Sequence, residues 1–222
     1  MLLCYSIIFQ YRDVVKQILE CGINESFILI LGKAAEEKQY FDLPYLKFSD
    51  NEVFLDIGGY VGETTEQFAK LVDNKYESIY VMEANKKLAC ECRDRLSALK
   101  NCRIIEKGCW SCTTTLGFKP NGEGSSVVEE NNDIIETISI DEMLDGKRAT
   151  YIKMDIEGSE YEALIGAEHT IKKYKPKLAI SVYHKRGDIW QIPMLLLSYN
   201  SDYKLYLRTY SFSGNDTVLY AL

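Results

Sequence analysis

Strand and helix patterns alternate along the chain from Asn51 onward, and this alternation limits the fold more than any other feature. Short apolar runs that suit buried strands recur between stretches with the period of an amphipathic helix. We expect strands over residues 53–57, 78–82, 103–106, 151–155 and 178–182, and helices over residues 63–72, 86–99, 160–173 and 189–198. Such alternation produces a mostly parallel sheet that is covered by helices on both faces.

The end of the chain predicts an exception to the parallel arrangement. Residues 203–209 and 217–221 read as strands, and the connection between them is too short for a parallel crossover, so they should pair antiparallel. Two further strands, over residues 113–119 and 134–139, suggest a hairpin around Asn121-Gly122. The predicted fold is therefore a Rossmann-like α/β fold with three αβα layers. Its mostly parallel seven-stranded sheet carries an antiparallel C-terminal strand.

The first 48 residues differ from the rest of the chain. Apolar side chains recur at helical spacing between Leu3 and Leu19, and a second helix is expected over residues 25–40. We interpret residues 1–48 as an N-terminal helical extension packed on a main domain of residues 49–222. A lid over a substrate site or a dimer contact is the alternative role for this extension.

Composition and charge exclude several classes of protein. The 222 residues are 46% hydrophobic and 27% charged, which suits an ordinary folded domain with a sizeable core. The formal net charge is −7 with no long basic block, which argues against a nucleic-acid partner. No apolar run approaches the roughly 20 residues needed to cross a bilayer, and the N-terminus lacks the pattern of a signal peptide. The seven cysteines show no disulfide framework, so we predict reduced thiols and a cytoplasmic location.

A glycine-rich turn over residues 56–62 follows the first strand of the main domain. Gly58 and Gly59 allow a sharp turn and a close approach of the backbone to a ligand. A dinucleotide-binding loop would require its second glycine at Tyr60, so a pyrophosphate group is disfavoured. Asp56, at the carboxyl end of the strand, suits a cationic ligand, and S-adenosylmethionine is cationic without a phosphate. A purely structural turn is the alternative.

Glu83 ends the second strand, about 20 residues beyond the glycine turn. A carboxylate at this place can accept two hydrogen bonds from the hydroxyls of a ribose. The alternative is an exposed acid at the start of a helix, where the helix dipole favours negative charge. Turn and acid together favour an S-adenosylmethionine site. A nicotinamide-dependent oxidoreductase and an inactive Rossmann-like binding protein are the competing interpretations.

A second acidic motif ends a central strand and places Asp155 and Glu157 at the same rim of the sheet as Asp56. Strand alternation points Lys153, Asp155 and Glu157 to one side. One of the two carboxylates can act as a general base, and the pair could orient a substrate hydroxyl or hold a divalent cation. His184, which follows the next strand, is a third candidate base. The structural alternative for the acidic motif is helix capping, and the one for His184 is a loop histidine that only makes hydrogen bonds. We assign no metal site.

These motifs also resemble those of one family. The segments IKMDIEGSE at residues 152–160 and ALIGA at residues 163–167 resemble the signature of the FkbM family of methyltransferases, and DIGGYVGETT at residues 56–65 resembles its first motif. The similarity covers about residues 50–222. It implies transfer of a methyl group from S-adenosylmethionine to a hydroxyl of a sugar, glycan or related metabolite. Family members often have Asn at the position of Tyr60 and Pro at the position of Ala84.

The site predicted from these patterns has two parts. The residues expected to bind the cofactor are Asp56, Gly58, Gly59, Tyr60, Gly62, Glu83, Ala84, Gly108, Cys109 and Trp110. The residues expected to carry catalysis are Asp155, Glu157 and His184. The last three cofactor residues follow the third strand, where a flat apolar wall would suit an adenine. A redox pair or a zinc site among the cysteines is the alternative use of this segment. The expected partner is a small-molecule or glycan acceptor, and a homodimer is left open.

Overall fold

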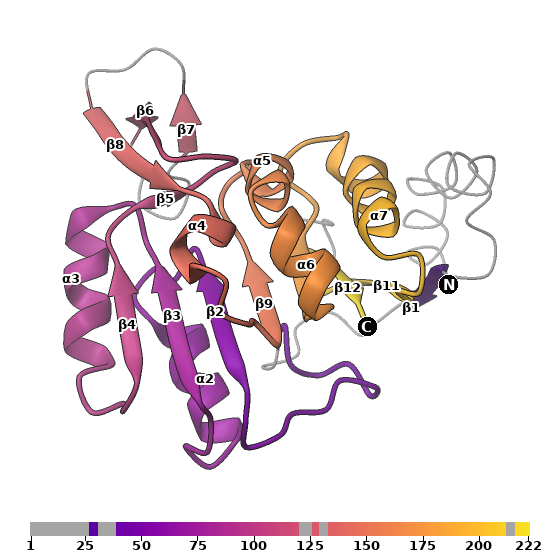
Figure 1. Cartoon of the computed structure of the whole chain (residues 1–222), viewed down its shortest axis with the longest axis horizontal. Coiled ribbons are helices and arrows are strands. Elements are labelled where there is room, and N and C mark those ends of the chain that lie inside the picture. The colour runs from indigo at the N-terminus through magenta and orange to yellow at the C-terminus, as the bar shows by residue number, and fades with distance from the viewer. Residues whose placement is uncertain (1–26, 31–38, 120–125, 129–132, 212–215) are drawn as a thin grey trace.

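The structure is a computed structural model that describes residues 27–30, 39–119, 126–128, 133–211 and 216–222 (Figure 1). The helix expected before Cys21 and the turn at Asn121-Gly122 lie outside the described residues. Within the described part, the strands and helices form one central sheet, a smaller second sheet and flanking helices.

The central sheet has eight strands in the order β1-β11-β12-β10-β9-β2-β3-β4. The strands are β1 (Phe27–Ile30), β2 (Val53–Ile57), β3 (Ser78–Met82), β4 (Cys102–Ile105), β9 (Tyr151–Met154), β10 (Lys177–Ser181), β11 (Leu205–Thr209) and β12 (Thr217–Ala221). All neighbours pair parallel except β12, which is antiparallel to both β10 and β11. The predicted seven-stranded sheet with an antiparallel C-terminal strand is confirmed, and β1 adds an eighth strand at the edge.

β1 corrects the expectation for the segment before Asn51. The sequence predicts a helix over residues 25–40, yet Phe27–Ile30 forms a strand that pairs parallel with β11. A run of four apolar residues suits a buried strand as well as a helix, and β11 offers it an open backbone edge. The division of the chain at residue 48 stays a prediction, although β1 ties part of the earlier segment to the main sheet.

Helices cover both faces of the central sheet and complete three layers (Figure 1). They are α2 (Glu63–Leu71), α3 (Lys86–Arg95), α4 (Ile140–Leu144), α5 (Glu160–Ile165), α6 (Glu168–Tyr174) and α7 (Asp188–Tyr199). One apolar core joins Leu55 of β2 to Leu164 of α5, and a second joins Phe54 of β2 to Phe68 of α2. Successive residues of β2 thus face opposite layers, as the strand geometry requires.

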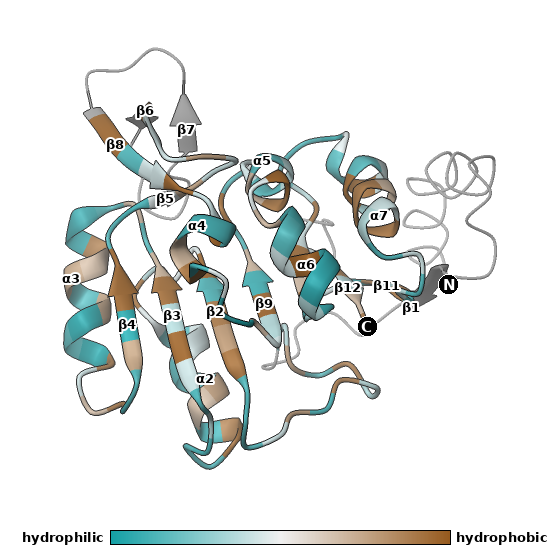
Figure 2. Cartoon of the chain, viewed as in Figure 1, coloured by the Kyte–Doolittle hydropathy of each residue, from teal (hydrophilic) through white to brown (hydrophobic). Residues whose placement is uncertain are grey.

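The distribution of hydropathy follows these layers. The central strands are largely apolar along their length, whereas α5 and α6 turn polar faces outward (Figure 2). All five residues of β2 are buried, which fits a strand covered on both faces. Among the described helices, none combines the length and apolar character needed to span a membrane.

The smaller sheet has four strands and lies at the carboxyl ends of β2, β3 and β4 (Figure 1). Its strands are β5 (Gly108–Cys109), β6 (Thr114–Lys119), β7 (Ser126–Val128) and β8 (Asp133–Ile138). The expected pairing of β6 with β8 is antiparallel as predicted, and β7 adds an unexpected strand beside β6. This sheet therefore stands over the rim where ligands bind in open α/β sheets.

Candidate active site

A cavity of about 440 Å³ opens at the carboxyl ends of the central strands, within the range of small-ligand sites. Its walls come from the glycine turn, the end of β3, the start of the smaller sheet and the turn after β9. The predicted site residues that line it are Gly58, Gly59, Tyr60, Glu83, Ala84, Gly108, Cys109, Asp155 and Glu157. Residues from three separate sequence motifs thus share one cavity.

The glycine turn packs so tightly that side chains are excluded at two positions. Gly58 has a φ of +83°, and a Cβ added there would lie 1.9 Å from the carbonyl oxygen of Asp155. A Cβ at Gly59 would lie 2.2 Å from Cγ1 of Val81. Both backbone N–H groups donate to the carbonyl oxygen of Met82, at 2.9 and 3.0 Å. The turn is therefore fixed against β3 and β9 and presents its backbone to the cavity.

Asp56 lies beneath the cavity and is not among the residues that line it, so its direct contact with a cofactor stays a prediction. The side chain is fully buried, with Oδ1 3.0 Å from Nζ of Lys153, and its Oδ2 accepts a hydrogen bond from Thr65 at 2.7 Å. Asp56 and Lys153 are register partners on β2 and β9, so their side chains leave the sheet side by side. The ammonium of Lys153 supplies the positive charge beside Asp56, where the sequence predicted a cationic ligand.

Lys153 connects this ion pair to the cavity wall. Its Nζ donates to the carbonyl oxygen of Gly58 at 2.7 Å and lies 5.3 Å from the centre of the Tyr40 ring. The ammonium thus stabilises the glycine turn and contacts the face of an aromatic ring, an attractive arrangement for a cation. Through Lys153, the Asp56 carboxylate is linked to the glycine turn at the cavity wall.

Glu83 reaches the cavity from the end of β3 and organises its surroundings. Oε2 accepts a hydrogen bond from the backbone N–H of Tyr60 at 2.9 Å, and Oε1 accepts one from Asn85 at 2.8 Å. Burial raises the pKa of Glu83 above its ordinary value, while these two N–H donors act in the opposite direction. Each carboxylate oxygen can accept a further hydrogen bond, so both remain usable by a ligand.

Asp155 is surrounded by hydroxyl donors. The Tyr40 hydroxyl donates to Oδ2 at 2.7 Å, and the Tyr183 hydroxyl donates to Oδ1 at 3.2 Å. Tyr40 is held in place by its own backbone, whose N–H donates to the Tyr220 hydroxyl at 3.1 Å. Burial raises the pKa of Tyr40 well above its ordinary value, so the phenol is a donor at neutral pH. The Asp155 carboxylate is thus held in one orientation at the cavity wall.

Glu157 arrives at the cavity by a turn rather than by strand alternation. β9 ends at Met154, and Glu157 has a φ of +56°. Lys153 and Asp155 share one side as predicted, and all three side chains line the cavity. The backbone of this turn is held by Glu160, whose Oε1 accepts a hydrogen bond from the N–H of Ile156 at 2.8 Å.

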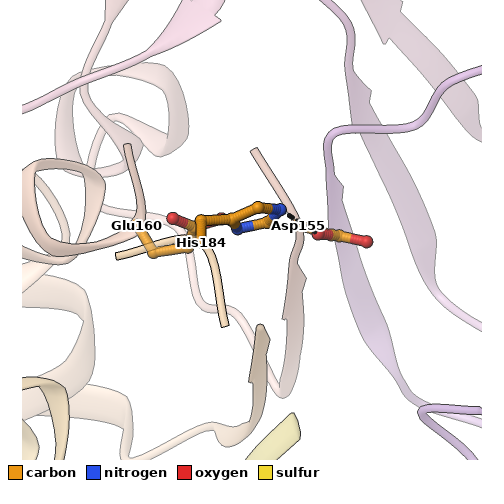
Figure 3. Close-up of side chains that lie close together, drawn as sticks. All are labelled: Asp155, Glu160 and His184. Atoms are coloured by element: carbon orange, nitrogen blue, oxygen red, sulfur yellow. Dashed lines mark ion pairs between the residues drawn. The ribbon is translucent and has the colours of Figure 1, made fainter. Parts of the chain in front are cut away.

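His184 lies between carboxylates behind the cavity wall, with Glu160 on one side and Asp155 on the other (Figure 3). Nδ1 is 2.9 Å from Oε1 of Glu160, and Nε2 is 3.5 Å from Asp155 and 3.4 Å from Glu157. Burial alone would lower the pKa of His184, but Glu160 and the two cavity carboxylates outweigh it and raise the pKa. The three predicted catalytic residues therefore meet in space, and Glu160 joins them.

Comparison with known proteins identifies the family. The family profile described as the Methyltransferase FkbM domain matches residues 56–213. The crystal structure of Methyltransferase FkbM from Methylobacillus flagellatus KT is 30% identical in sequence, with a TM-score of 0.72. The chain belongs to the FkbM methyltransferase family. This membership confirms the resemblance found in the sequence and supports S-adenosylmethionine as the predicted cofactor.

The extent of these similarities differs. The Methylobacillus comparison covers 83% of this FkbM-family chain but 47% of the other chain, so the chain spans less than half of that relative. Aeropyrum pernix fibrillarin, whose structure holds natively bound S-adenosyl-L-methionine, shares 10% identity with a TM-score of 0.51 over 80% of this chain and 70% of that one. That second likeness shows the fold alone. No curated protein sequence matches the chain significantly.

Several predicted residues lie away from the cavity of this FkbM-family chain. Among the described residues, the cavity lining does not include Gly62, Trp110 or His184. Gly62 has a φ of +87°, and an added Cβ would lie 3.1 Å from Cys92 and Leu96, so it lets α2 begin close against α3. A role for Trp110 beside an adenine stays a prediction, although its neighbours Gly108 and Cys109 do line the cavity.

The cysteine alternatives do not fit the described structure. Cys90 and Cys112 are exposed, whereas Cys92 and Cys109 are buried. Burial raises the pKa of Cys92 to about 12, which keeps it a thiol. Within the described ranges, no group of three cysteines lies close enough to share a metal ion. The neutral thiol of Cys109 therefore forms part of the cavity wall.

Sequence reasoning missed three residues that shape the site: Tyr40, Lys153 and Tyr183. Tyr40 precedes the family match and carries no motif that could have singled it out. Lys153 stands inside the IKMDIEGSE segment, where an apolar strand interrupted by one lysine was a usable signal. Tyr183 adjoins the candidate base His184, and this position was the signal that could have singled it out.

Proposed function

We propose that this chain transfers the methyl group of S-adenosylmethionine to a hydroxyl of a sugar, glycan or related metabolite. One observation carries the proposal: the glycine turn, Glu83 and Asp155 converge on a single cavity of about 440 Å³. The family assignment supports the methyl donor, and the carboxylates near the cavity support a hydroxyl acceptor.

The donor end of the cavity lies between the glycine turn and Glu83. Gly58 and Gly59 line the cavity with backbone alone, so a ligand can approach it closely. Glu83 keeps acceptor capacity on both oxygens and is suited to the two hydroxyls of a ribose. The adenosine part of the donor is therefore assigned to this end, beside Ala84 and Gly108.

The acceptor end lies at Asp155 and Glu157. Methyl transfer from a sulfonium is an in-line displacement by the acceptor oxygen, and correct alignment of the two reactants can contribute about 7–11 kcal/mol. The hydroxyl loses its proton as the new bond forms, and a positioned base accelerates this by about 10²–10⁴-fold. Asp155 is the proposed base because Tyr40 and Tyr183 fix its carboxylate at the cavity wall.

Calorimetry separates the proposal from its two alternatives. We expect the full chain to bind S-adenosylmethionine and its demethylated product, and not to bind NAD. Mass spectrometry should then detect the gain of one methyl group on a member of a panel of sugars, nucleotide-sugars and lipid-linked glycans. A folded chain that binds neither sulfur compound contradicts the proposal, whereas binding without any methyl transfer favours an inactive binding protein.

Glu83→Gln should weaken binding of the demethylated product by about 10-fold or more, because each hydrogen bond to a charged group contributes about 1.5–3 kcal/mol. The amide keeps the size of the side chain but can accept at only one of its two ends. Titration calorimetry gives the change in affinity. Glu91→Gln, an exposed change on the neighbouring helix α3, is the matched control and should bind like the parent. Equal affinity of the two variants would remove Glu83 from the binding site.

A further inference from the structure

Three side chains of metal-ligand type gather behind the cavity wall: Asp155, Glu160 and His184 (Figure 3). One ligand atom from each lies within 4.8 Å of the other two. They come from the turn after β9, the first residue of α5 and the segment after β10, so the fold itself brings them together. In the described part of the chain, no other group of three or more histidine, cysteine or carboxylate side chains is this close.

Buried polar atoms of this cluster lack hydrogen-bond partners. Glu160 is fully buried, and among the described residues its Oε2 accepts no hydrogen bond. The His184 side chain is 9% exposed, and its Nδ1 lies 2.9 Å from Glu160, whereas its Nε2 makes no hydrogen bond within the described ranges. Buried polar groups are nearly always paired, so the unpaired Oε2 of Glu160 and Nε2 of His184 are available to bind a ligand.

The charge around His184 points to a cation as that ligand. The carboxylates of Asp155, Glu157 and Glu160 lie within 3.5 Å of the imidazole. The nearby ammonium of Lys153 is already paired with Asp56 at 3.0 Å. The fully buried carboxylate of Glu160 most needs a counter-charge, because buried carboxylates are stable when they are paired or when they coordinate a metal.

We propose that Asp155, Glu160 and His184 bind one divalent transition-metal ion of the Mn²⁺ type. One imidazole nitrogen with two carboxylate oxygens is a mixed ligand set, whereas Mg²⁺ prefers oxygen ligands alone. Asp155 is the most exposed of the three ligands, and its Oδ1 lies 3.5 Å from Nε2 of His184. Glu160 therefore gains a role that the sequence motif alone did not assign.

The ion would stand next to the acceptor end of the cavity, because Asp155 belongs to both. A coordination position that faces the cavity would hold an acceptor hydroxyl and ease the transfer of its proton to the oxygen of Asp155 that does not bind the ion. This role of the ion in catalysis rests on the proposed methyl transfer. Binding of the ion to the three side chains does not.

Titration of the metal-free full chain with Mn²⁺ tests the site. Mn²⁺ is the probe because the exposed thiols of Cys90 and Cys112 would also bind Zn²⁺. We expect one ion per chain by calorimetry, and a matching loss of the free Mn²⁺ electron-spin signal. His184→Gln and Glu160→Gln should each weaken binding by about 10–100-fold or more. His169→Gln removes the other, exposed histidine of the chain and should bind like the parent.

Three outcomes overturn the site: a folded parent chain that binds no Mn²⁺, a folded His184→Gln variant that binds like the parent, and equal losses in the His184 and His169 variants. Circular dichroism checks that each variant is folded. If Glu160→Gln does not fold, the His184→Gln variant alone tests the site. Calorimetry with the demethylated cofactor on the same samples separates the two proposals. Cofactor binding without Mn²⁺ binding refutes the metal site alone, and Mn²⁺ binding without cofactor binding refutes the methyl transfer alone.

Discussion

Replacing Lys153 by methionine should lower the free energy of unfolding by about 3–5 kcal/mol, the usual effect of removing one partner from a buried ion pair. Methionine fills similar space, but the fully buried carboxylate of Asp56 loses its counter-charge. The carbonyl oxygen of Gly58 also loses its donor at the glycine turn. Urea denaturation followed by circular dichroism measures the change.

Lys107→Met is the control for this prediction. Lys107 also lines the cavity, but its ion pair with Glu136 is exposed at the surface, where such pairs contribute about 0–1 kcal/mol. Asp56→Asn combined with Lys153→Met should recover part of the lost stability, because no uncompensated charge then remains. A Lys153 variant no less stable than the Lys107 variant would show that the buried pair does not hold the turn.

Local patterns were sufficient to predict seven of the eight strands of the central sheet and the glycine turn. The apolar run of β2, followed at once by Gly58 and Gly59, can hardly form anything but a buried strand with a tight turn. The short link between β11 and β12 required an antiparallel pair, and the structure has one. These features depend on residues adjacent in the chain, so a single sequence carries them.

Features that depend on distant partners could not be predicted in the same way. β1 is a strand because it pairs with the edge of β11 in parallel. Its four apolar residues alone do not indicate that partner. The Asp56 carboxylate pairs with Lys153 because the two residues are register partners on β2 and β9, and no local rule gives the register of two parallel strands. Tyr40 reaches Asp155 with its backbone held by Tyr220 and Tyr151, which lie 180 and 111 residues away in the chain.

Replacing Asp155 by asparagine should slow methyl transfer by about 10²–10⁴-fold, while the affinity for the demethylated cofactor stays within a few-fold of the parent. Asparagine keeps the size of the side chain and an oxygen that can accept from Tyr40, but it does not take up the proton of the acceptor. The rate is measured with the acceptor that the mass-spectrometric panel identifies, at saturating cofactor.

The matched control is Asp94→Asn, an exposed change on α3 far along the chain from the rim motif, which should leave the rate unchanged. The two measurements on Asp155→Asn distinguish its roles, because a residue that acts only on donor binding would lose affinity rather than rate. A parent-like rate for this variant, with parent-like cofactor affinity, would exclude Asp155 as the base. Glu157, the other carboxylate at the acceptor end, would then be the residue to replace.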